Sequence, residues 1–284
     1  MPDHEAVRPA SEEASLPLRG RTALVTGVSR PRGIGFAVAR RLALLGADVV
    51  VHHHAPHDAD FPWGGADVDA VRRGLGQALV PGARSTDIAA DLVEDGAAEH
   101  VVDEARRLTG RLDVLVCNHA RAGHDASLLD ASADVLDGHW RVNTRATLLM
   151  TRRFAEQFVW DGDEHSTGRA IWMTSGQLHG PMPGEVAYAA RKAALAGVTQ
   201  TVAAELVRRG ILLNTVNPGP VNTGYLDPET SDRPDALDTL REAMPLGRFG
   251  HPDDPARLIG WLASDEGRWV VGETLSSDGG FRLG

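Results

Sequence analysis

Cysteine is nearly absent from the sequence, in which Cys117 is the single example. One cysteine cannot form an internal disulfide, and no Cys/His spacing of the zinc type occurs, so we expect a protein of the reduced cytoplasm without a bound metal. Long apolar runs are missing too, because even residues 34–51 contain two arginines and an aspartate. A membrane-spanning helix needs roughly 18 apolar residues in succession, so we expect a soluble protein.

Basic residues are outnumbered by acidic ones, 29 to 39, which gives a formal net charge of -10 at pH 7. Such a surface disfavours nucleic acid and anionic membranes as partners and leaves a small-molecule substrate as the expectation. The chain has 284 residues, of which 42% are hydrophobic, enough for a sizeable core. Residues 1–20 lack the basic start and apolar stretch of a signal peptide, so we predict a flexible tail followed by one domain over residues 21–284.

Short apolar runs alternate with longer amphipathic segments from Arg21 onward. This alternation is typical of repeated βαβ units and predicts a doubly wound, Rossmann-like α/β fold, a seven-stranded parallel sheet with helices on both faces. The strands are expected at residues 22–26, 48–53, 83–89, 112–117, 170–174, 211–216 and 270–275. The clearest helices are expected at residues 67–79, 94–108, 132–159 and 185–209.

Two segments interrupt this alternation. Residues 54–66 are rich in Pro, Gly and Asp and follow the second strand, and residues 223–250 separate the sixth strand from the next helix. We expect both to be loops near the carboxyl edge of the sheet, where open parallel sheets bind their ligands. The first would be an insertion, and the second would be a lid over the substrate.

The turn after the first strand is rich in glycine and reads T-G-V-S-R-P-R-G-I-G from Thr26 to Gly35. Glycine lets the backbone approach a pyrophosphate closely, and the following helix begins with free N–H groups and a partial positive charge. A strand, a glycine turn and a helix in this order favour a dinucleotide site, although a tight βα connection would need the same glycines.

A candidate catalytic set follows in the second half of the chain. Tyr188 and Lys192 are four residues apart in a predicted helix, so their side chains share one face. An ammonium near a phenol favours the phenolate, which lets the hydroxyl exchange a proton near neutral pH. Ser175 follows the fifth strand, where its hydroxyl could bind the same reacting oxygen, and the amide of Asn143 could hold a water behind the lysine.

These residues and motifs resemble the short-chain dehydrogenase/reductase family, above all the bacterial 3-oxoacyl-carrier-protein reductases and related ketoreductases. The family's turn reads T-G-x-x-x-G-x-G, so the turn of this chain is two residues longer, and Pro31 and Arg32 are the simplest candidates for the addition. The resemblance extends over residues 21–281 and implies hydride transfer between a nicotinamide dinucleotide and a carbonyl or secondary alcohol. It also implies that Tyr188 is the acid/base, Ser175 orients the substrate, Lys192 binds the nicotinamide ribose, and Asn143 supports a proton-conducting water.

The resemblance also implies a set of cofactor contacts. Cys117-Asn118-His119-Ala120 occupies the place of the family's N-N-A-G, so His119 either forms structural hydrogen bonds or lines the cofactor pocket. Asp91 and Leu92 resemble the pair that contacts adenine, and Thr223 resembles the residue that holds the nicotinamide carboxamide. The expected cofactor residues are Gly27, Ser29, Arg30, Gly33, Ile34, Gly35, His53, Asp91, Leu92, Asn118, Tyr188, Lys192, Pro218, Gly219, Val221 and Thr223.

The choice of cofactor depends on the end of the second strand. An enzyme that prefers NAD(H) places an acidic residue there, whereas this chain has three histidines, 52–54. Arg30, and also Arg32, could bind the 2′-phosphate, so NADP(H) is favoured over NAD(H). Asp58 and Asp60 in the insertion could supply the missing acid, so an NAD(H)-dependent alcohol dehydrogenase is the alternative.

Other classes of protein stay open at this point. A non-catalytic NADP(H)-binding sensor or scaffold would use the same turn, but it would not need Ser175, Tyr188 and Lys192 together. An epimerase or dehydratase usually has a larger C-terminal substrate region than this chain provides. From the resemblance, and from the long apolar-faced helices at residues 132–159 and 185–209, we expect a homotetramer or at least a dimer.

Overall fold

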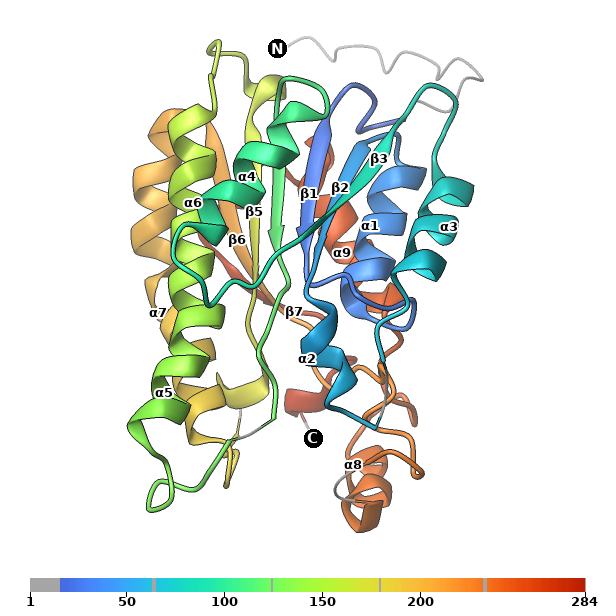
Figure 1. Cartoon of the computed structure of the whole chain (residues 1–284), viewed down its shortest axis with the longest axis vertical. Helices are drawn as coiled ribbons and strands as arrows, with labels where there is room; N and C mark the ends of the chain where they lie inside the picture. Colours follow the sequence, from blue (N-terminus) through green and yellow to red (C-terminus); the bar gives the residue numbers. More distant parts are fainter. Residues whose placement is uncertain (1–15, 63–64, 124, 179, 232–233, 284) are drawn as a thin grey trace, which may run out of the picture.

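A twisted parallel sheet forms the centre of the computed structural model, which describes residues 16–62, 65–123, 125–178, 180–231 and 234–283 (Figure 1). Its strands lie in the order β3-β2-β1-β4-β5-β6-β7, and every neighbouring pair is parallel. The strands are β1 (Thr22–Thr26), β2 (Asp48–His53), β3 (Ser85–Ala89), β4 (Val114–Cys117), β5 (Gly168–Met173), β6 (Ile211–Asn217) and β7 (Thr274–Ser276). The predicted fold class is therefore confirmed.

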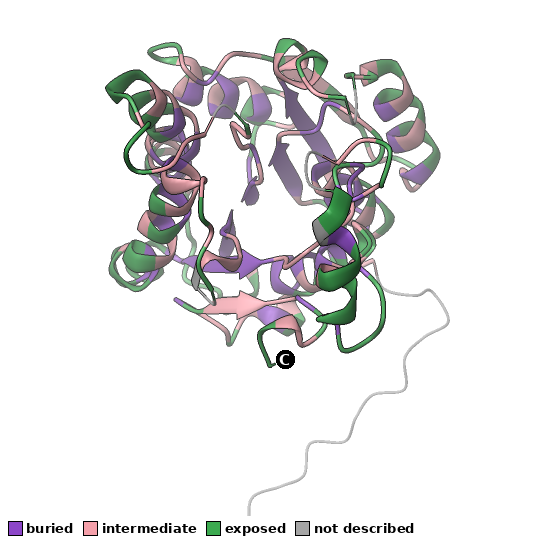
Figure 2. Cartoon of the chain, turned by 90° about the horizontal axis from the view of Figure 1, so that it is seen from below, coloured by how far each residue is buried: buried purple, intermediate pink, exposed green. Residues whose placement is uncertain are grey.

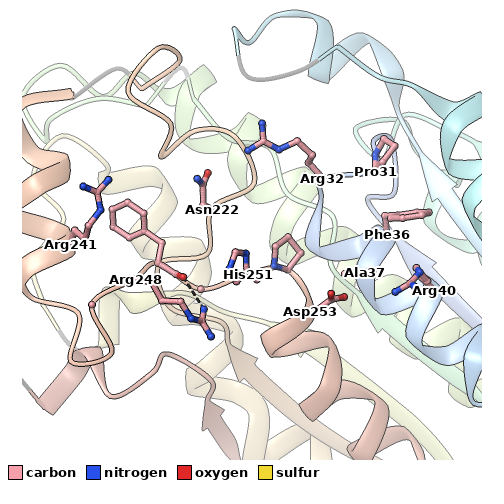
Figure 3. Close-up of a pocket in the computed structure, with 14 residues that line it drawn as sticks. Pro31, Arg32, Phe36, Ala37, Arg40, Asn222, Arg241, Arg248, His251 and Asp253 are labelled. Carbon is pink, nitrogen blue, oxygen red and sulfur yellow. Dashed lines mark hydrogen bonds between the residues drawn. The ribbon is translucent and has the colours of Figure 1, made fainter.

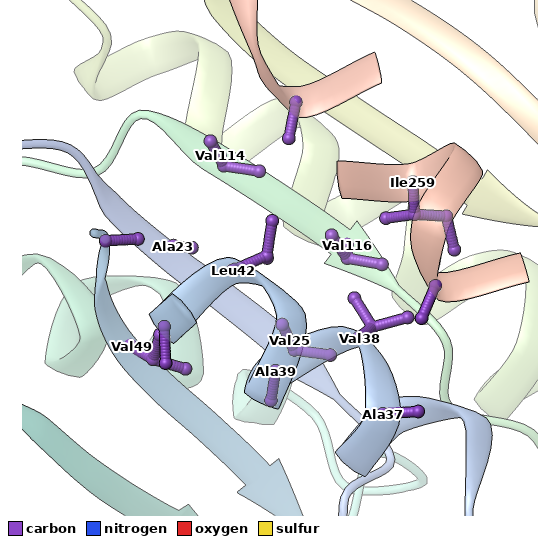
Figure 4. Close-up of a cluster of buried hydrophobic side chains, with 14 of the residues drawn as sticks. Ala23, Val25, Ala37, Val38, Ala39, Leu42, Val49, Val114, Val116 and Ile259 are labelled. Atoms are coloured by element: carbon purple, nitrogen blue, oxygen red, sulfur yellow. The ribbon is translucent and has the colours of Figure 1, made fainter. Parts of the chain in front are cut away.

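Helices cover both faces of the sheet, because successive side chains of each strand point to opposite faces and both sets are apolar. Ala23 and Val25 of β1 pack in one core, and Leu24 packs in the other. The first core contains α1 (Ile34–Leu44), α3 (Val68–Ala78) and α9 (Asp253–Ala263), and Figure 4 shows its centre. The second contains α4 (Ala97–Arg107), α6 (Ala146–Gln157) and α7 (Val186–Leu206). Seen from below, buried strands are surrounded by helices whose outer surfaces are exposed (Figure 2).

The predicted helix at residues 132–159 is divided into three parts. α5 (Ala133–Trp140) and α6 are joined by a π-helical turn, Arg141–Arg145, which contains Asn143. Such turns are frequent at functional sites. The predicted helix at residues 185–209 corresponds to α7 followed by a short 3₁₀ turn, Val207–Arg209.

The strands predicted to start at residues 83, 112 and 170 start at Ser85, Val114 and Gly168, and two further boundaries also differ. The last strand begins at Thr274 rather than at residue 270, because Gly272 has a φ of +76° and interrupts the extended backbone. The tail does not extend to residue 20, because Leu18 is fully buried in the first core and its N–H donates to Leu45 O at 2.9 Å. Residues 1–15 of the predicted tail lie outside the described part of the chain.

The two irregular segments lie beyond the carboxyl ends of the strands (Figure 1). The insertion, predicted as a loop, contains the short helix α2 (Ala55–Ala59), whose first turn accommodates Pro56 without losing a hydrogen bond. Segment 223–250 contains a 3₁₀ turn, Pro234–Ala236, and α8 (Leu237–Glu242). Leu226, Leu237, Met244 and Phe249 give this segment a small core of its own. Among the described helices, none is long and apolar enough to cross a membrane.

Candidate active site

The glycine turn between β1 and α1 leaves no room for side chains at two of its positions. A Cβ added to Gly27, which has a φ of +73°, would lie 2.7 Å from His119 Cα, and one added to Gly35 would lie 2.5 Å from Gly27 O. Asn118 Nδ2 donates to the carbonyl oxygens of Thr26 and Gly27, at 3.1 Å each. The end of β4 thus fixes a bare backbone turn in front of the N-terminus of α1, an arrangement that fits a pyrophosphate.

The two arginines of this turn bind other segments of the protein. Arg30 Nη1 donates to Thr223 O at 2.7 Å, and Arg30 Nε lies 3.6 Å from a carboxylate oxygen of Asp58. Arg32 forms an ion pair with Asp227 at 2.8 Å. Both arginines therefore have protein partners, and Arg30 connects the glycine turn to the insertion and to segment 223–250.

Histidines, not acids, occupy the end of β2. Burial lowers the pKa of His52 to about 4, and its ring lies between Gly27 N and Ala90 O. His53 Nε2 is 3.1 Å from an oxygen of Asp87. After β3, Asp91 accepts the N–H of Val93 at 3.0 Å, and Leu92 is buried. In the described ranges, no three His, Cys, Asp or Glu side chains group in a way that could hold a metal ion.

His119 forms structural hydrogen bonds. Its Nδ1 is 2.7 Å from Thr26 Oγ1 and its Nε2 is 3.3 Å from Thr147 Oγ1. Burial lowers the pKa of His119 to about 3, so the ring is neutral and joins β1 to α6. The neighbouring Cys117 is buried as well, which raises the pKa of its thiol to about 12 and leaves it unreactive.

The tyrosine and lysine candidates lie one turn apart near the start of α7. The end of β5 fixes the lysine, because Lys192 Nζ donates to Met173 O at 2.8 Å and Thr174 Oγ1 donates to Lys192 O at 3.0 Å. Ser175 is the next residue and is partly exposed. Burial, followed by the charge of Arg191, lowers the pKa of Lys192 to about 7. The lysine can thus gain or lose a proton near neutral pH.

The amide of Asn143, predicted to hold a water, binds backbone groups in the structure. Its Oδ1 accepts the N–H of Arg121 at 2.9 Å, and its Nδ2 donates to His139 O at 2.8 Å. Both polar atoms of this buried side chain therefore bind backbone groups. The contact with Arg121 attaches the connection between β4 and α5 to the π-helical turn, and the contact with His139 ties that turn to α5.

The residues expected to contact nicotinamide follow β6. Asn217 Oδ1 accepts the N–H of Gly219 at 3.1 Å, which shapes the turn that begins at Pro218. Gly219 has a φ of +67°, and a Cβ there would lie 2.7 Å from Asp278 Cα. Val221 pairs with Gly250 in an isolated bridge, and Thr223 is the residue bound by Arg30. The predicted cofactor residues thus lie at or after the carboxyl ends of β1 to β6, and Tyr188 and Lys192 lie on α7.

Two residues near Tyr188 and Lys192, here called the dyad, were missed by sequence reasoning. Both carboxylate oxygens of Asp125 accept backbone N–H groups at the start of α7, from Ala187 at 3.0 Å and from Tyr188 at 2.7 Å. The guanidinium carbon of Arg191 lies 4.1 Å from the centre of the Tyr188 ring. Asp125 is 63 residues from Tyr188 in sequence, so no local pattern points to it. Arg191 precedes Lys192 directly, but an arginine in a helix is usually assigned to its exposed face.

A cavity of about 660 Å³ lies on the outer side of the glycine turn (Figure 3). Pro31, Arg32 and Phe36 contribute to its wall, together with residues 247–253, and none of the four predicted catalytic residues lines it. Aspartates pair with three of its arginines, Arg32, Arg241 and Arg248. We therefore assign the reaction site to the carboxyl edge of the sheet and not to this cavity.

Comparisons with known proteins agree with this geometry. Residues 27–282 match the family model described as Enoyl-(Acyl carrier protein) reductase. The uncharacterized oxidoreductase YjdA of Bacillus subtilis is 35% identical over 264 residues, which cover 93% of this chain and 98% of the relative. The chloroplastic NADPH-dependent aldehyde reductase-like protein of Arabidopsis thaliana is 32% identical, over 94% of this chain and 96% of the relative.

Solved structures give the same result. The crystal structure of a short chain dehydrogenase from Burkholderia cenocepacia in complex with NADP has a TM-score of 0.78 and 34% identity, and covers 93% of this chain and 99% of that one. This chain therefore belongs to the short-chain dehydrogenase/reductase family. It is an oxidoreductase of the class that acts on CH–OH groups.

Proposed function

We propose that the protein transfers a hydride reversibly between NADP(H) and a ketone or secondary alcohol, with Tyr188 as the general acid/base. One observation carries the proposal: Tyr188 and Lys192 lie on one turn of α7, and β5 fixes the lysine through Met173 O at 2.8 Å. Ser175 follows the same strand. A phenol, an ammonium and a hydroxyl at one sheet edge are the groups that a carbonyl oxygen needs when it gains a proton.

The cofactor would lie along the carboxyl edge of the sheet, from the glycine turn toward α7. The bare backbone at Gly27 and Gly35 fits its pyrophosphate, since a Cβ at either position would collide with the main chain. Pro218, Gly219, Val221 and Thr223 would hold the nicotinamide end. The bound dinucleotide supplies or accepts the hydride at the reacting carbon.

The protein's own residues handle the proton. In carbonyl reduction, Tyr188 Oη gives its proton to the substrate oxygen as that oxygen becomes a hydroxyl, and Ser175 Oγ orients the oxygen by donating a hydrogen bond. In alcohol oxidation, the same proton returns to Tyr188. Lys192 stabilises the phenolate while it is charged, and its pKa of about 7 allows it to pass a proton on toward solvent. Asn143 keeps the neighbouring connection in place and supports the water that this transfer requires.

NADP(H) is the proposed cofactor. No acidic residue ends β2 to bind a ribose 2′-hydroxyl, because the strand finishes with His52 and His53. Two relatives support the same choice by their names, one a dehydrogenase in complex with NADP and one an NADPH-dependent reductase-like protein. Because Arg30 binds Thr223 and Asp58, we attribute the preference to the absence of an acid at β2 and not to Arg30.

A kinetic experiment tests the proposal. The purified chain is assayed with a panel of ketones and secondary alcohols, with NADPH or NADH absorbance as the readout. Tyr188→Phe should lower kcat by about 10² to 10⁴ while folding and dinucleotide affinity are retained. Arg257→Gln, which changes an exposed side chain on α9, is the control and should leave kcat within about two-fold of the original. Normal turnover by folded Tyr188→Phe would contradict the mechanism and favour a sensor or scaffold, and a better kcat/KM with NADH would reverse the cofactor assignment.

We also propose that segment 223–250 is a lid. Ion pairs and hydrogen bonds attach its first residues to the glycine turn, through Arg30 to Thr223 and through Arg32 to Asp227. A bound dinucleotide at that turn would therefore bias the position of the lid. Hydrogen exchange in the described residues between 225 and 240 should slow when cofactor and substrate are added together. Equal exchange with and without them would exclude a lid.

We also propose that the protein forms a homotetramer in the cytoplasm. α5 and α7 carry partly exposed apolar side chains at Leu136, Trp140 and Val198, which a second subunit could cover. Sedimentation of the protein at micromolar concentration should give a mass near four times 30.3 kDa. A monomer would contradict the proposed assembly but not the proposed reaction.

A further inference from the structure

Arg191 is a buried cation that the reaction scheme above does not use. Its side chain extends from α7 into the protein, and only 1% of its surface is exposed. Nη1 donates to the carbonyl oxygen of Arg121, whereas Nε and Nη2 are buried without a hydrogen-bond partner among the described residues. Its guanidinium carbon lies 4.1 Å from the centre of the Tyr188 ring. A charge buried at this cost beside a reacting group needs a functional reason.

The negative charges around Tyr188 explain why a buried arginine is useful here. The carboxylate of Asp125 accepts the N–H of Tyr188 itself at 2.7 Å, and Glu185 precedes α7 as its N-cap residue. Both carboxylates oppose the formation of a phenolate beside them. Arg191 has favourable interactions with Tyr188, Asp125 and Glu185 together, although burial, the largest effect, lowers its pKa to about 10. It therefore stays charged at neutral pH, where Lys192, with a pKa of about 7, is only partly charged.

We propose that Arg191 is a positioning residue for proton transfer, a fixed cation on the face of the Tyr188 ring that offsets the carboxylates of Asp125 and Glu185. It acts through Tyr188 and touches neither substrate nor cofactor. The inference rests on the proposed function of Tyr188 and adds to it a second positive charge on the dyad's own helix. A cation against the ring face attracts the phenol and attracts the phenolate more strongly, so it stabilises the state that follows proton donation.

Other titratable groups near the dyad do not replace Arg191. Burial lowers the pKa of His139 on α5 to about 4, so this ring is neutral during catalysis. Burial raises the pKa of Tyr225, so its hydroxyl stays protonated. The remaining charged groups that interact with Arg191 or with the dyad are Arg121, Asp125, Glu185 and Lys192. Arg191 is the buried cation that contacts the Tyr188 ring.

The chain offers a direct assay, because it contains 2 tyrosines. Protein labelled with ¹³C at tyrosine Cζ gives two NMR signals that report ionisation of each phenol, and Tyr225→Phe assigns them. In Arg191→Gln, the pH at which Tyr188 ionises should rise by about one unit or more, the usual effect of losing an opposite charge at this distance. Arg191→Lys should recover at least part of the shift. Arg257→Gln, which removes an exposed arginine on α9, should leave the titration unchanged.

A double variant separates charge from packing. Glu185→Gln in the Arg191→Gln background removes one of the opposing carboxylates, so the ionisation of Tyr188 should move back toward the original pH. The acid limb of the pH profile of kcat/KM for alcohol oxidation should follow the NMR titration in each variant. An unchanged Tyr188 titration in folded Arg191→Gln, or a shift that Arg191→Lys reproduces in full, would overturn the proposal.

The NMR titration of Tyr188 can be carried out even if one variant fails to fold or no substrate is known. If Arg191→Gln does not fold, Arg191→Met keeps the buried side chain long and apolar without its charge, and the same comparison with Arg191→Lys applies. The NMR titration needs no turnover, so it stands or falls separately from the proposed reaction, which Tyr188→Phe tests.

Discussion

Replacing Asp125 by alanine should loosen the first turn of α7 and misplace Tyr188, the proposed acid/base. The two oxygens of this carboxylate accept the N–H groups of Ala187 at 3.0 Å and Tyr188 at 2.7 Å. α7 begins at Val186, so these N–H groups belong to the first turn, where no helical carbonyl is available to accept them. The aspartate also places a negative charge at the positive end of the helix.

The magnitude follows from these two contacts. Loss of a capping side chain costs about 0.5 to 2 kcal/mol, and hydrogen bonds to a charged group contribute about 1.5 to 3 kcal/mol each. Because water can replace the partly exposed carboxylate, we expect Asp125→Ala to lower the free energy of unfolding by about 2 kcal/mol. A shift of about 1 Å in the Tyr188 backbone can reduce the rate up to about a hundred-fold, so kcat should fall by about ten- to a hundred-fold.

Urea denaturation at constant m-value measures the first effect, and steady-state kinetics with a verified substrate measures the second. Asp67→Ala is the matched control, because Asp67 caps α3 by accepting the N–H of Ala70 at 2.8 Å. It should cost about 1 kcal/mol of stability and leave kcat within about two-fold. If Asp125→Ala and Asp67→Ala had the same small effect on kcat, the reasoning about Tyr188 would be refuted.

Three further predictions concern charge. Lys192→Ala should lower both kcat and dinucleotide affinity, whereas Tyr188→Phe should lower kcat alone, and fluorescence titration with NADPH separates the two. Arg30→Ala should weaken NADPH and NADH use about equally, because Arg30 binds Thr223 and Asp58; a selective loss of NADPH use would show that it binds the phosphate. Burial lowers the pKa values of His52 and His139 to about 4 and that of His119 to about 3, below the unfolded value of 6.5. The unfolded chain therefore binds more protons than the folded chain below pH 6.5. As the pH drops toward 4, the free energy of unfolding should fall by about 1.4 kcal/mol per pH unit for each of these histidines. Urea denaturation measures this dependence, and His139→Gln should make it less steep.

The parts of the site that depend on local spacing could be predicted from sequence. Tyr188 and Lys192 are one helical turn apart in any α-helix, and the glycine turn follows a strand of β-branched residues. The parallel sheet follows from the alternation of such strands with amphipathic helices. Each of these patterns extends over fewer than about 30 residues, the size of one βαβ unit.

The missed features depend on contacts between distant parts of the chain. Arg30 binds Thr223, 193 residues away, and Asp125 binds Tyr188, 63 residues away, so no periodicity encodes these contacts. The burial of Arg191 is decided by the connection between β4 and α5, which covers it, and not by its own helix. The π-helical turn at Arg141–Arg145 has the same composition as an ordinary helix. It widens where Asn143 binds backbone groups outside the helix.

The ties that Arg30 makes restrict how this scaffold can be re-engineered. Substrate range in such enzymes would normally be altered by exchanging one surface loop for another, on the assumption that loops are independent modules. Here the side chain of Arg30 holds Asp58 of residues 54–66 and Thr223 of segment 223–250 at the same time. A graft that replaces only segment 223–250 would leave a half-buried arginine and aspartate without their present partner. Loop libraries built on this chain should therefore exchange residues 54–66 and 223–250 as one unit, together with Arg30.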